Sequence, residues 1–168
     1  GLTEDRWVRA IEMRPSTTEG RKIIHHALAR LQQEEDDVDK ESLVAAGGAG
    51  LLMEWAVGKE GEIMRENSGK LIKAGSEILW DIHYSSAGEE VTDSVELGLY
   101  FYPKDAPPKH RQVLNIWMGI EGGPNNLLLP PNSVTTTSQH HVMRQNGRIE
   151  NFQPHQHLRG KGMQMTAI

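Results

Sequence analysis

The segment EILWDIHY, Glu77–Tyr84, decides the fold class because two kinds of side chain alternate along it. One face of an extended chain would carry the apolar and aromatic residues Ile78, Trp80, Ile82 and Tyr84. The other face would carry Leu79, Asp81 and His83. A period of two is the period of a β-strand, and Val95–Phe101 alternates in the same way. The sequence therefore predicts two strands joined by a loop that begins with a turn at residues 85–89.

Further short β segments lie on both sides of this pair. We predict a strand over residues 7–14, which Arg14-Pro15-Ser16 ends,. Residues 22–31 begin with β-branched side chains, so a strand is favoured over a helix there. After a break at residues 103–108, one β segment is bounded by residues 127–131 and 135–137, and another covers residues 149–157. Such short strands, punctuated by glycine and proline, predict an all-β chain that forms a β-sandwich or jelly roll.

A domain boundary is predicted within residues 116–124, where three glycines and a proline gather,. We expect a jelly-roll β-sandwich over residues 1–118 and the start of a second β-sandwich domain over 119–168. The second part is too short for a complete sandwich, and residues 163–168 look like a strand that is cut off. The chain begins with Gly1 rather than methionine. We therefore expect a processed product or a fragment, and a removed signal peptide remains open.

The composition excludes several classes of function. A formal charge of −5 and a pI near 5.9 argue against a dedicated nucleic-acid binder, which usually carries a basic face,. No apolar run is long enough to cross a bilayer. The chain has no cysteine, so a bound metal would be held by its eight histidines, its seven methionines or its carboxylates,. The acidic run at residues 34–41 is expected to be a solvated loop, followed by a flexible Gly/Ala stretch at residues 45–50.

Five of the eight histidines fall into three clusters with the character of metal ligands,. In His155-Gln156-His157 the two imidazoles are two residues apart, so on an extended strand they share a face and can reach one ion. A pair of exposed or hydrogen-bonded histidines beside Pro154 is an equal alternative. Cupins also carry His-x-His, followed by a glutamate. Here residues 158–161 are LRGK, which argues against cupin chemistry.

The other two clusters are harder to interpret from spacing. Neighbours on a regular strand point to opposite faces, so His25 and His26 can share an ion only across a bulge or twist. The alternative is one buried and one exposed imidazole. His83 alone is typical of an ordinary strand histidine, and Asp81 on the same face could orient its imidazole or simply be solvated. We predict no metal role for His110, His140 or His141.

Taken in order, these segments resemble the copper type II, ascorbate-dependent monooxygenases, the family of peptidylglycine α-hydroxylating monooxygenase and dopamine β-monooxygenase. The segments EDRWVRAIEMRP (4–15) and IHHAL (24–28) are similar to the family strand and its paired histidines. LMEWA (52–56) and IHY (82–84) resemble the region of the third histidine. LPPN (129–132) and PHQHLRGK (154–161) resemble the start of the second domain. The closer likeness is to bacterial members of uncharacterised substrate.

The resemblance implies two jelly rolls that each hold one copper across a solvent-filled cleft. It assigns His25, His26 and His83 to the electron-transfer copper, and His155 and His157 to the copper that activates oxygen. The implied reaction is hydroxylation of a substrate C–H bond with O2. The electrons would come from ascorbate or another one-electron donor.

One departure from the family concerns the oxygen site. The family adds a methionine ligand from a strand well beyond His-x-His, and this chain ends before that point. Met163 and Met165 do not match its position. The implied substrate is a small molecule or a peptide, and the implied location is periplasmic or secreted.

Two other functions remain open at this stage. The first is a non-catalytic copper-binding or structural subunit of a larger extracytoplasmic assembly, in which other subunits would cover the incomplete second domain. The second is a cupin-like iron or zinc dioxygenase.

Overall fold

The computed structural model describes residues 1–34, 50–114, 120, 126–143 and 146–168. The chain divides into two compact units, Gly1–Trp117 and Met118–Ile168. Most of the acidic run, nearly all of the Gly/Ala stretch and most of the predicted boundary region lie outside the described residues. No helix among the described residues is long and apolar enough to span a membrane.

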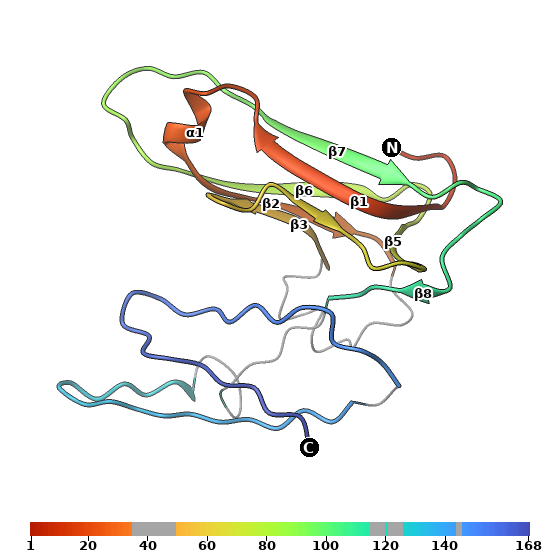
Figure 1. Ribbon diagram of the computed structural model, residues 1–168. Helices are drawn as coiled ribbons and strands as arrows, with labels where there is room; N and C mark the ends of the chain where they lie inside the picture. Colours follow the sequence, from red (N-terminus) through yellow and green to blue (C-terminus); the bar gives the residue numbers. More distant parts are fainter. Residues whose placement is uncertain (35–49, 115–119, 121–125, 144–145) are drawn as a thin grey trace. The chain divides into compact units, whose positions relative to one another are not determined.

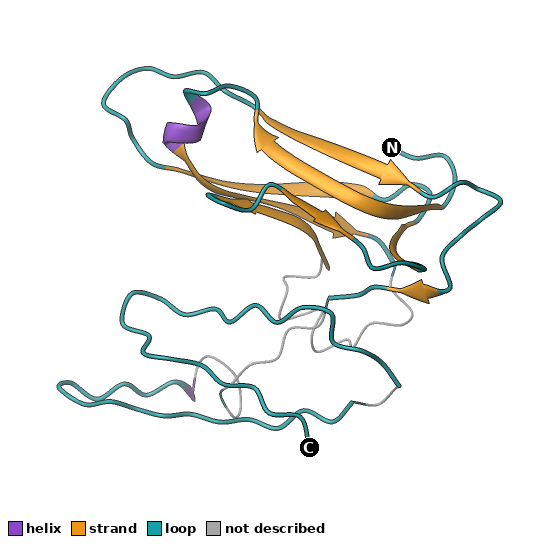
Figure 2. Cartoon of the chain, in the orientation of Figure 1, coloured by secondary structure: helices purple, strands orange, loops and turns teal. Residues whose placement is uncertain are grey.

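Two β-sheets make up the first unit (Figures 1 and 2). The larger sheet contains β1 (Arg6–Pro15), β4 (Gly61–Ile63), β5 (Ser68–Ile72), β7 (Val95–Phe101) and β8 (His110–Arg111). The smaller sheet has the order β3 (Gly50–Ala56), β2 (Ile24–Gln32), β6 (Glu77–Tyr84). A single helical turn, α1 (Gly20–Ile23), precedes β2. The prediction of an all-β chain is thus confirmed.

β1 is the central strand of the larger sheet because it pairs on both sides. Its pairing with β4, β5 and β7 is antiparallel throughout. The ladder with β7 shifts register between Val8 and Ala10. This shift explains why the buried positions change from even to odd numbers, from Val8 to Ile11 and Met13,. Only the short contact between β5 and β8 is parallel among the described strands.

β2 is the central strand of the smaller sheet and presents one apolar face to the core. Ala27, Ala29 and Leu31 are buried on that face. β3 adds Met53 and Trp55, which lie opposite Ala29 and Ala27. These side chains join Val8, Ile11, Met13 and Ile72 of the larger sheet in one hydrophobic cluster. Burial on this side leaves the alternate residues of β2, from His26 onward, on the outer face.

The strands predicted over residues 7–14, 77–84 and 95–101 are confirmed, with the ends of the first extended by one residue each. The strand predicted over residues 22–31 begins two residues later, at Ile24. The reason is the helical turn before it, in which the backbone N–H of Gly20 donates to Thr17 Oγ1 at 2.9 Å. The two strands around residues 85–94 are confirmed as separate, since β6 and β7 belong to different sheets.

Regular strands were also predicted in the second unit, and this prediction is wrong for its described residues. No strand is assigned there, and Figure 2 draws the described segments almost entirely as loop. Residues 127–137 and 149–157 lack the ladder hydrogen bonds of a strand. An alternating pattern supplies one face of a strand, but a strand also needs a neighbour for its N–H and C=O groups.

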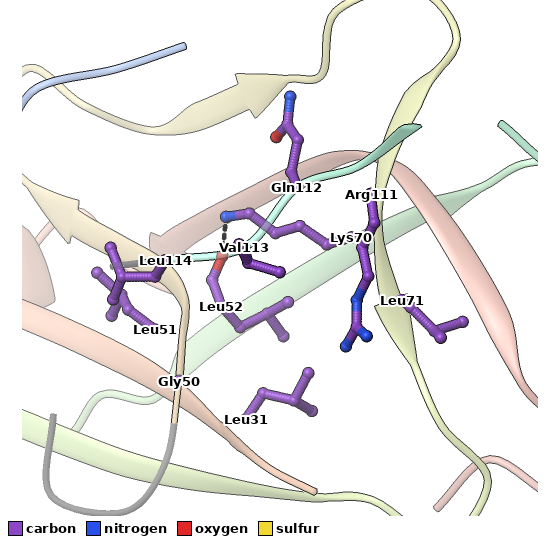
Figure 3. Close-up of a pocket in the computed structure, with 10 residues that line it drawn as sticks. All are labelled: Leu31, Gly50, Leu51, Leu52, Lys70, Leu71, Arg111, Gln112, Val113 and Leu114. Atoms are coloured by element: carbon purple, nitrogen blue, oxygen red, sulfur yellow. Dashed lines mark hydrogen bonds between the residues drawn. The ribbon is translucent and has the colours of Figure 1, made fainter. Parts of the chain in front are cut away.

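Lys70 links the two sheets of the first unit. Its Nζ donates to the carbonyl oxygen of Leu52 on β3 at 2.6 Å and to Glu62 Oε2 on β4 at 3.1 Å. Figure 3 shows the Lys70 side chain reaching Leu52 across a small, mainly aliphatic pocket. The residues that line this pocket include no histidine.

Candidate metal centre

A bulge in β2 brings His25 and His26 to the same place. Ile24 pairs with Tyr84 of β6 and His26 pairs with His83, so two steps along β2 correspond to one step along β6. His25 is the extra residue, and a bulge of this kind redirects a side chain that a regular strand would send to the opposite face. The Nδ1 atoms of His25 and His26 consequently lie 2.9 Å apart.

His83 joins this pair through the ladder between β2 and β6. It lies directly opposite His26, and their ring centroids are 4.1 Å apart with an angle of 51° between the planes. The centroids of His25 and His26 are 5.0 Å apart. The three imidazoles therefore form one contact group, the His25/His26/His83 cluster, at the outer face of the smaller sheet.

The surroundings of His26 favour its neutral form. Burial lowers the pKa of His26, and the nearby His83 and His25 lower it further. The charges of Glu54 and Asp81 act in the opposite direction but do not reverse the shift. Neutral imidazole is the form of histidine that binds metal ions. Lowering the pKa of His26 therefore keeps it ready to act as a ligand.

Two charged neighbours complete the outer face around the cluster. Asp81 Oδ1 lies 3.2 Å from His83 Nε2, and Asp81 Oδ2 lies 4.0 Å from Arg30 Nη2. The sequence left open whether Asp81 orients His83 or is simply solvated, and in the structure the two side chains are in contact. Arg30 and Glu54 were not singled out from the sequence. Arg30 lies four residues after His26 on the same strand, so a period of two predicts that both side chains share one face. Glu54 belongs to β3, where consecutive apolar residues make the alternation impossible to recognise from the sequence.

The second pair, His155 and His157, is also brought together in the second unit. Their Nε2 atoms are 3.1 Å apart, and their ring centroids are 5.1 Å apart. The side-chain amide of Gln156 donates to the carbonyl oxygen of Gly162 at 2.7 Å. The backbone N–H of Gly160 donates to the carbonyl oxygen of His157. This turn holds Gln156 while both imidazoles remain exposed.

In both the His25/His26 pair and the His155/His157 pair, the distance between the two facing ring nitrogens fits coordination of one shared ion. Two nitrogens that are each about 2.0–2.1 Å from one ion lie about 2.9–3.4 Å apart for angles between square and tetrahedral. The observed 2.9 Å and 3.1 Å fall in this range. The same distances also suit a hydrogen bond between a protonated and an unprotonated nitrogen. Imidazole donors suit copper, and they also suit zinc, iron and nickel.

The described residues contain no closed cluster of three or more His, Asp or Glu side chains with the geometry of a metal site. In the His25/His26/His83 cluster the rings of His26 and His83 lie against each other at a tilt. His25 and His83 are exposed, so rotation of their side chains is unhindered by packing. The pairing of β2 with β6 thus brings the three imidazoles into one contact group.

The remaining histidines lie elsewhere. His110 begins β8 of the larger sheet, and His140 and His141 lie in the second unit, away in sequence from His155 and His157. Comparison with protein-family models, curated proteins and solved structures found no match to this chain. The two histidine groups and the order of the motifs around them are therefore the features of this chain that bear on its function.

Proposed function

We propose that this chain is a copper- and O2-dependent monooxygenase-like protein that hydroxylates a C–H bond using a one-electron reductant such as ascorbate. The observation that supports the proposal most is the bulge at His25. It is the feature that adjacent histidines need in order to face one ion, and it places them beside a third imidazole from another strand. An ordinary structural histidine pair would not require this arrangement.

In this proposal His25, His26 and His83 hold the electron-transfer copper, and His155 and His157 hold the copper at which oxygen reacts. Bound copper would supply one-electron redox chemistry at each position. The residues of the chain supply neutral nitrogen donors, and burial with neighbouring imidazoles keeps His26 in that state. Exposure of His155 and His157 leaves their site open to O2 and to a substrate.

The finer assignment of the fold belongs to the same proposal. The two sheets of the first unit would correspond to a jelly-roll β-sandwich, and the second unit to part of another. The substrate would be a small molecule or a peptide, and the protein would work in the periplasm or outside the cell. The order of the motifs, from the strand before His25 to the residues after His157, supports this assignment.

A non-catalytic copper-binding or structural subunit is the second candidate, and one observation favours it. Large apolar side chains of the second unit are exposed, among them Leu128, Val134, Val142 and Leu158. Where exposed apolar side chains gather into a patch, they mark a surface that another chain covers. In that case other subunits of an extracytoplasmic assembly would contact the second unit.

The consumption of O2 tests the catalytic proposal. The purified chain is loaded with copper, freed of unbound metal and given ascorbate, and O2 uptake is followed with an electrode. We expect His155→Ala to lower the rate to that of the copper-free protein, because the oxygen site loses a ligand. The copper at the His25/His26/His83 cluster should still be reduced, as seen by loss of its paramagnetic signal.

His140→Ala is the matched control, because it removes an exposed imidazole from the same unit without touching the pair. Its rate should equal that of the wild type. An unchanged rate in His155→Ala would exclude the proposed oxygen site. A wild type that binds copper but consumes no O2 would favour the non-catalytic subunit.

A further inference from the structure

The strand β6 has one edge that pairs with no other strand of the described residues. It ends the smaller sheet, whose order is β3-β2-β6, and its ladder to β2 runs over its whole length. The backbone N–H and C=O groups that point away from β2 therefore form an open row. Native proteins often protect such an edge with lysine or proline, because an open edge can pair with another chain. The sequence of β6, EILWDIHY, contains neither.

Large apolar side chains are exposed along this edge. Trp80 lies opposite Ala29 of β2, whose side chain is buried, so Trp80 points to the core side of the sheet. Trp80 is nevertheless 43% exposed, and so is Leu79 on the outer face. The core thus ends at β6 with a tryptophan at its open margin. Because tryptophan is enriched at the centres of protein interfaces, this margin suits contact with another chain.

The edge of β6 fits a second copy of itself. Two copies related by a two-fold axis perpendicular to the sheet pair antiparallel, and their core sides then face the same way. Opposite residues must lie on the same face, so two odd or two even residues are opposed. Two such registers give the longest ladder. One is centred on Trp80 and pairs residues 77–83, and the other is centred on Asp81 and pairs residues 78–84.

Charge decides between these two registers. In the register centred on Asp81, the carboxylate opposes its own copy, and like charges directly opposite each other are destabilising. In the register centred on Trp80, Asp81 opposes Leu79. Glu77 opposes His83, so no carboxylate faces another one. The register centred on Trp80 is therefore favoured.

The core sides of the two copies complement each other in the same register. Ile78 of each copy opposes Ile82 of the other, and the two Trp80 side chains meet at the axis. We propose that β6 is an interaction surface on which two copies of this chain pair antiparallel about Trp80, forming one continuous sheet in the order β3-β2-β6-β6-β2-β3. The pairing does not depend on the metal centre. A single pair of strands buries a small area, so the dimer is weak and forms only at high protein concentration.

Sedimentation velocity of the full chain over a range of concentrations measures the association, and an added chelator excludes dimers that an ion bridges. Leu79 allows a test of the register, because it is exposed and opposes Asp81 of the other copy. Leu79→Lys places an opposite charge there and should tighten the dimer, whereas Leu79→Glu should weaken it. Each change should be about 2- to 30-fold, since two symmetric cross-strand pairs change at once.

Ile63→Lys and Ile63→Glu are the matched controls, because they make the same changes of charge at an exposed residue of β4. Neither should alter the association. Hydrogen exchange locates the contact. The backbone amides of β6 should gain protection as the concentration rises, and those of β7, which pairs with β1 alone among the described strands, should not.

A wild type that stays monomeric at the highest concentration would overturn the proposal. So would a dimer that responds alike to Leu79→Lys and Leu79→Glu, or one in which the amides of β6 gain no protection. Circular dichroism shows that both Leu79 variants are folded, so that a change in association reports the contact between copies and not loss of the strand. The hydrogen-exchange result needs no variant and tests the pairing by itself.

Discussion

At the scale of single residues, the protonation state of His26 links the structure to the proposed function. It is half-buried on β2 between two other imidazoles, and both its burial and these neighbours disfavour a positive charge. If His26 binds the proposed copper, the lowered pKa makes it a better ligand near neutral pH, because less protonation competes with metal binding,. It also makes the metal-free fold sensitive to acid.

The sign of this sensitivity follows from the direction of the shift. Above the ordinary histidine pKa of about 6.5, His26 is neutral in the folded and in the unfolded chain. As the pH falls through that value, the unfolded chain takes up the proton first, because the folded pKa is lower. The free energy of unfolding of metal-free protein should therefore decrease, until folded His26 is protonated as well.

Urea unfolding of metal-free protein between about pH 8 and about pH 5 measures this effect on both sides of the ordinary value. The decrease in stability should be smaller in His26→Gln than in the wild type. His110→Gln, which removes an exposed histidine outside the cluster, should keep the wild-type slope. Identical slopes in His26→Gln and the wild type would show that His26 carries no depressed pKa.

Much of the cluster could be anticipated from the residues, but its geometry could not. The spacing showed that His25 and His26 need a bulge to share an ion, and a register shift lies at that position. Sequence alone could not place it, because a bulge is defined by the partner strand as much as by its own residues. The pairing of His26 with His83 likewise depends on a register between strands more than fifty positions apart.

At the scale of elements, Lys70 shows how a buried charge connects β3, β4 and β5. Burial lowers the pKa of Lys70, although the charge of Glu62 partly offsets it. Burial acts to raise the pKa of Glu62, but Lys70 and Lys59 outweigh this and leave that pKa lowered. Burial therefore disfavours the charged form of the lysine. Its bond to the Leu52 carbonyl compensates by joining the two sheets.

Lys70→Met should lower the free energy of unfolding by about 1–3 kcal/mol, because the carbonyl of Leu52 and Glu62 lose a buried, charged donor. The methionine keeps the apolar stem. Lys59→Met removes the more exposed partner of Glu62 and should cost only about 0–1 kcal/mol,. Urea unfolding followed by tryptophan fluorescence measures both. Equal small losses in the two variants would contradict the role given to Lys70.

The sequence predicted β6 and β7 from their clear alternation, and it predicted β2 from the β-branched residues at its start. β1 was expected as a strand that ends at Arg14-Pro15-Ser16, and each of the four strands lies near its expected place. β4 and β8 are only three and two residues long, so no period can be read from them. β3 hides its period because Leu51, Leu52 and Met53 are consecutive apolar residues. In the second unit, the segments predicted as strands have no partner strand among the described residues. The pattern of side chains alone could not reveal that a partner is missing.

At the scale of the whole molecule, the two units contribute differently. All of the buried hydrophobic residues among those described belong to the first unit, which gives the His25/His26/His83 cluster a rigid support. His155 and His157 lie in the second unit, whose described residues are almost all exposed. If each group of imidazoles holds its own ion, loss of one site should leave the other intact.

The copper content of the purified full chain, combined with paramagnetic resonance of the oxidised protein, tests the central claim most directly. We expect two copper ions per chain in the wild type, one in His83→Ala, and two in the control His110→Ala. The signal that disappears in His83→Ala should be one with nitrogen ligands. The same copper content in His83→Ala as in the wild type would show that His25, His26 and His83 do not share an ion.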